Sequence, residues 1–292
     1  MRKLLKNDFL RIFKSGGFRA ILIVGLILGA LSPVALYGII MLILTYMPDA
    51  AGSFDMRTAI NSINMFSSSL SIASTNFFSV ILVIILIAQI SRDFTQGTIR
   101  NKIIEGYSRT KIYFSTLIVI FTTILLSLFM YGIVRFGVSL IFFNPLPEGD
   151  VVDHILYIVE TFGFQLLYIL FISSFISLFV FINKRALMPL LFFIIGIMLI
   201  RSIGAITDLT KGSVEYGSFP YYLLRYLTIL NPFYMYEYLG PNGSLLGLLG
   251  NFITPIGDYT IAKSIELGVP LLLYISINIP FGLLAANKSD IK

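Results

Sequence analysis

The chain has 292 residues, of which 57% are hydrophobic and only 12% are charged. Soluble domains carry about a quarter charged residues, so this composition excludes an ordinary soluble protein and predicts an integral membrane protein. The net charge is +6, but the basic residues are spread over several short segments, and we expect no nucleic-acid partner. The absence of cysteine excludes disulfides and thiolate metal sites, and the single His154 cannot form a histidine cluster, so no metal site is predicted.

The first fifteen residues combine apolar and basic positions in a helical pattern. The apolar residues at helical spacing are Leu4, Leu5, Phe9, Ile12 and Phe13. The basic residues at other positions are Arg2, Lys3, Lys6 and Arg11. This pattern predicts an amphipathic helix over residues 1–15 that lies at the inner face of the membrane.

Long charge-poor runs follow, and each has at least the length of ~20 residues that a membrane-spanning helix needs. They predict six spans, at residues 20–46, 70–90, 112–136, 155–182, 186–206 and 267–286. The expected fold is therefore an all-α integral membrane protein, with residues 1–292 forming one transmembrane domain. Gly25 and Gly29 form a GxxxG pattern in the first span, which would let another helix approach closely, including one from a second copy of the chain.

The basic residues also predict the orientation. Fifteen of the 21 Lys and Arg residues lie in four segments, at residues 1–19, 91–111, 183–185 and 287–292. Cytoplasmic segments of membrane proteins carry such an excess of basic residues. We therefore expect a multi-pass protein of the cell (plasma) membrane with both termini in the cytoplasm.

The segment between the second and third spans is a charged island with signals for a short helix. Thr98 is expected to cap a helix that runs to Glu105. Gly106 suits the left-handed residue that ends a helix, and Ser108 can cap the next helix. A short cytoplasmic helix between two membrane helices is typical of a part that docks onto another protein.

This island resembles a known family. The residues that carry the resemblance are Gly97-Thr98-Ile99-Arg100-Asn101-Lys102-Ile103-Ile104 and Gly106-Tyr107-Ser108-Arg109-Thr110-Lys111-Ile112-Tyr113. They are similar to the first cytoplasmic loop of bacterial ABC transporter permeases of the type-2 exporter class. The resemblance implies that the short helix is a coupling helix seated on a separate ATP-binding subunit. The implied docking residues are Thr98, Ile99, Arg100, Lys102, Ile103, Ile104, Glu105, Ser108 and Arg109.

The same resemblance implies the other partners and the cofactors. The complete transporter would hold a second permease chain, identical or related, and ATP and Mg would bind in the partner ATPase. The chain itself lacks the GxxxxGK[ST] phosphate-binding pattern. We therefore expect that it is not an enzyme and binds no cofactor of its own.

Residues 207–266 form the longest segment outside the predicted spans. They are rich in tyrosine, which favours the headgroup level of a membrane, and Pro residues divide them into short pieces. Related exporters carry re-entrant helices here, so the resemblance implies an outer gate. Its expected residues are Tyr221, Tyr222, Asn231, Pro232 and Phe233. An aromatic belt that only anchors the protein is the alternative.

Three charges lie inside predicted spans, and one of them, Arg201 near the outer end of the fifth span, is expected to reach the interface with its long side chain. Arg135 is late in the third span and Glu160 is early in the fourth, so the two are expected at similar depth. A lone charge in lipid costs about 2.5–3.5 kcal/mol on insertion scales, which favours an ion pair between them.

The residues leave other functions open. The apolar spans favour an amphipathic substrate, such as a hydrophobic peptide or a lipid-like compound. An ATP-independent channel or scaffold would keep the spans but would have no use for a capped cytoplasmic helix. A polytopic membrane enzyme would need polar residues that converge at one depth, and the spans offer few.

Overall fold

The computed structural model describes the backbone of residues 1–46, 62, 77–143, 151–184, 188–195, 218–219 and 261–288. Helices dominate this part of the chain, and no strand occurs in it. The main helices are α1 (Arg2–Lys14), α2 (Gly16–Tyr46), α6 (Phe77–Thr95), α7 (Thr98–Ile104), α8 (Arg109–Ser139), α9 (Val151–Asn183) and α14 (Ile261–Lys288). The predicted all-helical class is therefore confirmed for the described residues.

Among the described residues, four helices contain a stretch that is long and apolar enough to cross a bilayer. These stretches are Gly16–Leu42, Arg109–Ser139, Gln165–Asn183 and Gly268–Lys288. A fifth candidate is α6 together with α7, a pair bent by 53° at the break between them. The described part of the chain thus contains four or five apolar helices, as in a multi-pass membrane protein.

The remaining parts of the six-span prediction are described only in part. Residues 188–195 are helical and lie within the predicted fifth span, at 186–206. The other residues of the predicted fifth span, 186–187 and 196–206, lie outside the described residues. The same holds for residues 70–76 of the predicted second span. The number six therefore stays a prediction.

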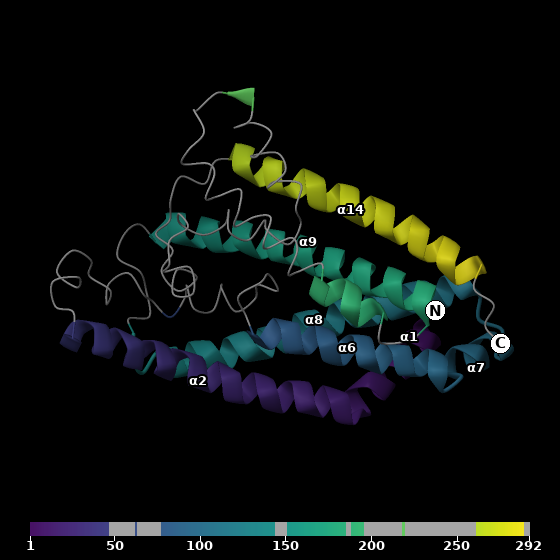
Figure 1. Ribbon diagram of the computed structural model, residues 1–292, viewed down its shortest axis with the longest axis horizontal. Coiled ribbons are helices and arrows are strands. Elements are labelled where there is room, and N and C mark those ends of the chain that lie inside the picture. Colours follow the sequence, from purple (N-terminus) through teal and green to yellow (C-terminus); the bar gives the residue numbers. More distant parts are fainter. Residues whose placement is uncertain are drawn as a thin grey trace.

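The helices α2, α6, α8, α9 and α14 run lengthwise along the molecule (Figure 1). Helix α8 lies between the others and contacts α2, α6, α9 and α14, while α14 packs mainly on α9 and α2 mainly on α8. Helices α1 and α7 lie together at one end, near both termini (Figure 1). We call this end, formed by α1, α7, the start of α8 and the end of α14, the α7 end.

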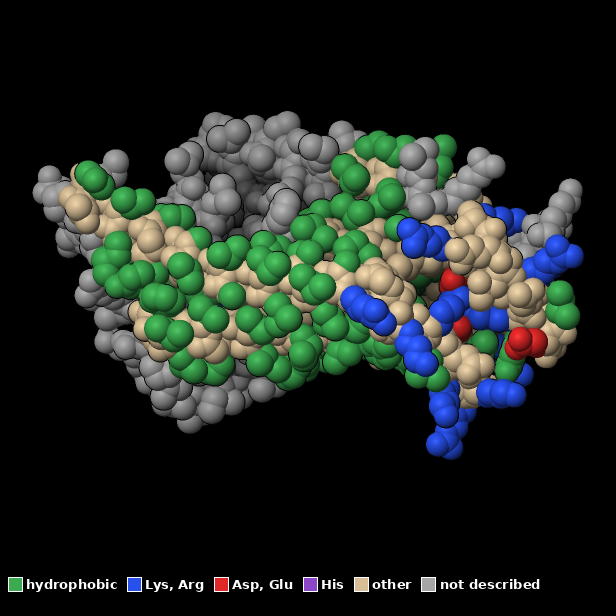
Figure 2. Space-filling view, turned by 90° about the horizontal axis from the view of Figure 1, so that it is seen from below, with side chains coloured by type: hydrophobic (Ala, Val, Ile, Leu, Met, Phe, Trp, Pro, Cys, Tyr) green, Lys and Arg blue, Asp and Glu red, His purple; other side chains and the backbone are tan. Residues whose placement is uncertain are grey.

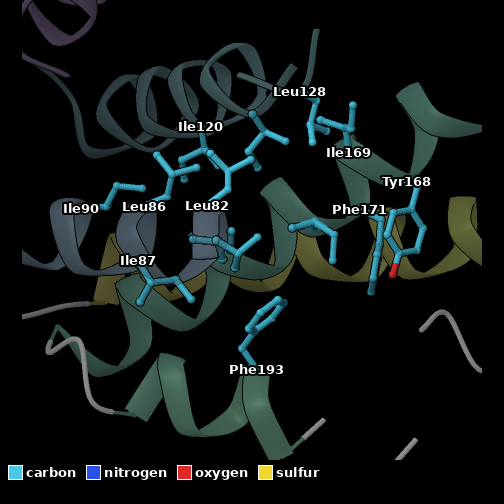
Figure 3. Close-up of a cluster of buried hydrophobic side chains, with 14 of the residues drawn as sticks. Leu82, Leu86, Ile87, Ile90, Ile120, Leu128, Tyr168, Ile169, Phe171 and Phe193 are labelled. Carbon is cyan, nitrogen blue, oxygen red and sulfur yellow. The ribbon is translucent and has the colours of Figure 1, made fainter. Parts of the chain in front are cut away.

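The body of the molecule is held by an apolar core between α6, α8 and α9 (Figure 3). Leu82 and Leu86 of α6, Ile120 of α8 and Phe171 of α9 have at most 2% of their surface exposed. On α2 and α14, by contrast, many large apolar side chains point outward, among them Ile23, Leu31, Leu272 and Phe281. Outward apolar faces on long helices are expected where the surroundings are lipid.

The two glycines of the GxxxG pattern are used within the chain. A Cβ atom on Gly25 would lie 3.0 Å from the ring of Phe78 in α6, and one on Gly29 would lie 3.2 Å from the carbonyl oxygen of Tyr131 in α8. The Phe78 and Tyr131 rings are themselves stacked, with centroids 4.7 Å apart. The small residues thus let α2 approach its own neighbours closely, so this face of α2 is already occupied.

Candidate docking site

Helix α7 begins differently from the sequence prediction. Thr98 is not the capping residue: the N-cap is Gly97, which has φ 71° and makes no side-chain cap bond. The chain must turn sharply between α6 and α7, and that turn uses a left-handed residue. Glycine adopts this conformation without steric cost, whereas a threonine would be strained there. Thr98 is therefore the first residue of the helix itself.

The end of α7 agrees with the prediction. Gly106 has φ 87°. Its N–H donates to the Ile103 carbonyl at 2.9 Å, and the Tyr107 N–H donates to the Lys102 carbonyl at 3.1 Å. This pair of bonds is the Schellman motif, which satisfies the last carbonyls of a helix. Ser108 then caps α8, because its Oγ accepts a bond of 3.4 Å from the Lys111 N–H.

One side of α7 is buried against the rest of the chain. Ile99 is 2% exposed and lies in an apolar cluster with Leu4 of α1, Tyr113 of α8, Phe181 of α9 and Ala286 of α14. Lys102, three residues later, is 8% exposed. Both were expected at a docking surface, but within this chain their side chains face inward. They attach α7 to four other helices instead.

Lys102 is buried because it has an ion-pair partner in α1. Its Nζ lies 2.7 Å from Asp8 Oδ1, and Asp8 Oδ2 accepts a 2.7 Å hydrogen bond from the hydroxyl of Ser115 in α8. Arg11 lies 3.7 Å from the same Asp8 carboxylate and forms an ion pair with Asp93 of α6. Two acids and two bases therefore form a neutral group, which we call the charge cluster. It joins α1 to α6, α7 and α8.

Asp93 is the member of this cluster whose pKa burial shifts toward neutrality. It lies three residues beyond Ile90, where the predicted second span ends. Burial raises the pKa of its carboxyl group to about 6, while the charges of Arg11 and Lys102 act in the opposite direction. A small cavity beside it is lined by Asp8, Arg11, Asp93 and Thr116, together with apolar residues. We therefore expect the charge of Asp93, and with it that of the charge cluster, to change near pH 6.

The opposite side of α7 faces outward. Arg100 and Glu105 are exposed, and Ile104 has 73% of its surface exposed. Thr98 and Ile103 are half-buried. Figure 2 shows that Lys and Arg side chains gather at this end of the molecule, while the rest of the described surface in that view is mainly hydrophobic. Helix α7 thus presents a mixed charged and apolar tip on a fixed base.

Two further residues expected at the docking surface have structural roles at its edge. Ser108 is the cap of α8, as described above. Arg109 donates a 2.5 Å hydrogen bond from Nη1 to the carbonyl oxygen of Asn287, close to the end of α14. A cation at this place is favourable because the last carbonyls of a helix carry partial negative charge. Arg109 thereby connects the start of α8 to the end of α14.

The structure describes only some of the remaining predicted site residues. Arg135 is buried in α8, with 3% of its surface exposed. The side chain of Glu160 lies outside the described residues, so the ion pair between them stays a prediction. Tyr221, Tyr222, Asn231, Pro232 and Phe233 also lie outside the described residues, and with them the expected outer gate.

The sequence prediction missed the charge cluster. A signal for it was present: Asp8 is the only acidic residue of α1 and is spaced four residues from both Leu4 and Ile12, which puts all three on one helix face. An acid on the apolar face of a basic helix indicates a buried partner.

No family model, curated protein or solved structure matches this chain.

Proposed function

We propose that the chain is the membrane-spanning permease subunit of an ATP-driven transporter of the ABC type-2 exporter class. In this proposal α7 is the coupling helix and docks onto a separate ATP-binding subunit, which holds the ATP and Mg. The observation that carries the proposal is the two-sided helix α7. Ile99 and Lys102 hold its inner side, while Arg100 and the 73% exposed Ile104 are free on its outer side.

The connections of α7 support a role in transmitting movement. A partner that pushes on its tip would act on α6 through the short turn at Gly97, and on α8 through the Ser108 cap. It would also act on α1 through the ion pair between Lys102 and Asp8. Through these three connections, a displacement of α7 would move α1, α6 and α8 together.

The wider assembly belongs to the same proposal. The chain would cross the plasma membrane six times with both termini in the cytoplasm, and a second permease chain would complete the pathway. Charged side chains are concentrated at the α7 end, and the long helices are apolar (Figure 2). This favours an amphipathic cargo, such as a hydrophobic peptide or a lipid-like compound, over a strongly charged solute.

The test uses the absence of cysteine from the chain. An Ile104→Cys variant carries one photocrosslinking group at the tip of α7, in native membranes. We expect it to capture an ATP-binding subunit, and we expect Arg100→Glu in the same chain to abolish the capture. The matched control is Ile141→Cys, since Ile141 is 75% exposed but lies beyond the other end of α8.

The control separates docking from general reactivity. Capture from position 104 and not from 141 would support the proposal. A folded, labelled protein that captures no ATP-binding subunit from position 104 would contradict it and favour a channel or scaffold that works without ATP.

A further inference from the structure

Helix α1 places its charges on two sides. Leu4, Asp8 and Ile12 are buried, and Asp8 is the only acidic residue of the helix. The exposed residues of the helix are Arg2, Lys3, Lys6, Asn7, Leu10 and Lys14. At 100° per residue these positions lie together on the side opposite the buried three. The outward side of α1 thus carries cations, one amide and one leucine, without a carboxylate.

The buried acid does not offset these cations. Asp8 is paired with Lys102 at 2.7 Å, and Arg11, which lies nearby, is paired with Asp93. The charge cluster is therefore neutral by itself. No ion pair with an acidic residue of the described part involves Lys3, Lys6 or Lys14. The positive charge on the outward side of α1 is left for an external anion.

An apolar strip runs beside the cations. Leu5, Phe9 and Phe13 are half-buried, with the Phe9 and Phe13 rings stacked at 5.8 Å. Phe13 meets Phe18 of α2 edge-on at 4.8 Å, just after the break at Ser15 where the apolar helix α2 begins. The strip is therefore continuous with a helix that is long and apolar enough to span a bilayer. A basic face next to an apolar strip at the start of a span fits the headgroup layer of a membrane.

We propose that the outward side of α1, with Lys3, Lys6, Leu10 and Lys14, binds the anionic phospholipid headgroups of the adjoining leaflet. The occupant is a lipid surface because the cations are spread along the helix and accompany the apolar strip, and do not converge on one point. Each cation near a membrane surface strengthens binding to anionic lipid about fivefold. Lipid binding itself does not depend on the proposed docking role of α7.

The chain lacks tryptophan, so a Leu10→Trp variant contains a single fluorophore of this kind on the proposed surface. The full-length variant is placed in phosphatidylcholine vesicles with a small fraction of brominated lipid, either phosphatidylglycerol or phosphatidylcholine. We expect brominated phosphatidylglycerol to quench the tryptophan more strongly at equal fractions. The preference obtained from the quenching curves should weaken in high salt, because exposed charges are screened.

Charge variants then test which cations act. Adding Lys6→Gln and Lys14→Gln should reduce the preference about fivefold for each lysine. The matched control adds Lys111→Gln and Lys288→Gln, which remove two exposed cations elsewhere at the α7 end, and should leave the preference unchanged. Thermal unfolding in detergent shows whether each variant folds, and the single lysine variants replace the double one if it does not.

Three results would overturn the proposal. The first is equal quenching by the two lipids. The second is an equal loss in the Lys111 and Lys288 control, which would show only an effect of net charge. The third is competition by soluble glycerophosphate that removes the preference as fully as high salt at matched ionic strength. That result would assign the cations to a free phosphate compound and not to a bilayer.

Discussion

The body of the molecule and its α7 end are held together in different ways. In the body, apolar side chains such as Leu82, Ile120 and Phe171 fill the space between long helices, so many weak contacts share the stabilisation. At the α7 end, a seven-residue helix is fixed by a few directional contacts, above all the pair between Lys102 and Asp8. A helix this short is not stable alone. Single changes of polar residues should therefore affect stability most at the α7 end, where the helices are shortest.

The largest expected effect is at Asp8. Asp8→Ala should lower the free energy of unfolding by about 3–5 kcal/mol, because it leaves the buried Lys102 without its partner. Unfolding in detergent followed by circular dichroism measures this. Asp8→Asn combined with Lys102→Met should restore most of the loss, since a buried pair can be replaced by neutral groups. Glu105→Ala, at an exposed acid, is the control. An equal cost at both positions would show that the buried pair contributes no more than an exposed acid at the same end.

The next effect tests packing at the α7 end. A Cβ atom on Gly282 of α14 would lie 2.3 Å from the hydroxyl oxygen of Tyr113 and 2.6 Å from its ring. Gly282→Ala should therefore destabilise the protein by about 1–3 kcal/mol. Gly137→Ala in α8, where the space is open, should be neutral or stabilising by up to about 1 kcal/mol. Thermal unfolding of the two variants side by side checks this, and similar shifts would contradict the close contact.

A pH effect should separate the charge cluster from the apolar body. Because burial raises the pKa of Asp93 from 3.8 to about 6, the folded protein keeps a proton that the unfolded chain has already lost between these values. The contribution of Asp93 to stability is therefore present at lower pH and is lost as the pH rises through about 6. The decline should approach about 1 kcal/mol per pH unit.

The measurement is the difference between the natural chain and Asp93→Asn in unfolding free energy across this range. Arg11→Gln should shift the decline to higher pH, because the Arg11 charge lowers the pKa of Asp93. A difference that does not vary with pH would show that Asp93 does not titrate there.

The smallest effect is expected at the turn before α7. Gly97 has φ 71° with open space around it, so Gly97→Ala should cost about 1 kcal/mol through backbone strain alone. Gly16→Ala is the control, because Gly16 also has open space but no positive φ. Equal stability of the two variants in thermal unfolding would mean that the turn adopts another backbone conformation at no cost.

The local rules of the sequence predicted much of this architecture. Charge-free runs identified α2, α8 and α14, because a helix in lipid must be long and apolar. Gly106 and Ser108 marked the end of α7 and the start of α8, since each acts through its own backbone or side chain. The Lys102 and Asp8 pair was beyond such rules, because its members are far apart in the chain. The basic residues around Asp8 also drew attention away from it, because a basic amphipathic helix is already explained as a membrane anchor.

The inner side of α7 was also beyond local rules. Seven residues make only two turns, too few for a hydrophobic period to tell Ile99 from Ile104, yet one is buried and the other is 73% exposed. Gly97, and not Thr98, is the N-cap of α7 because the bend between α6 and α7 determines the backbone conformation at this position. This bend depends on the packing of both helices.

The attachment of α7 by Ile99 and Lys102 limits how docking of the proposed partner could be blocked. A free synthetic peptide with the sequence of residues 98–105 would lose both attachments and would stay largely unfolded in water. Such a peptide would be a poor competitor, even with Arg100 and Ile104 in place. A competitor would need a chemical staple between the positions of Ile99 and Lys102, since these two side chains are buried within the chain and would not contact the proposed partner.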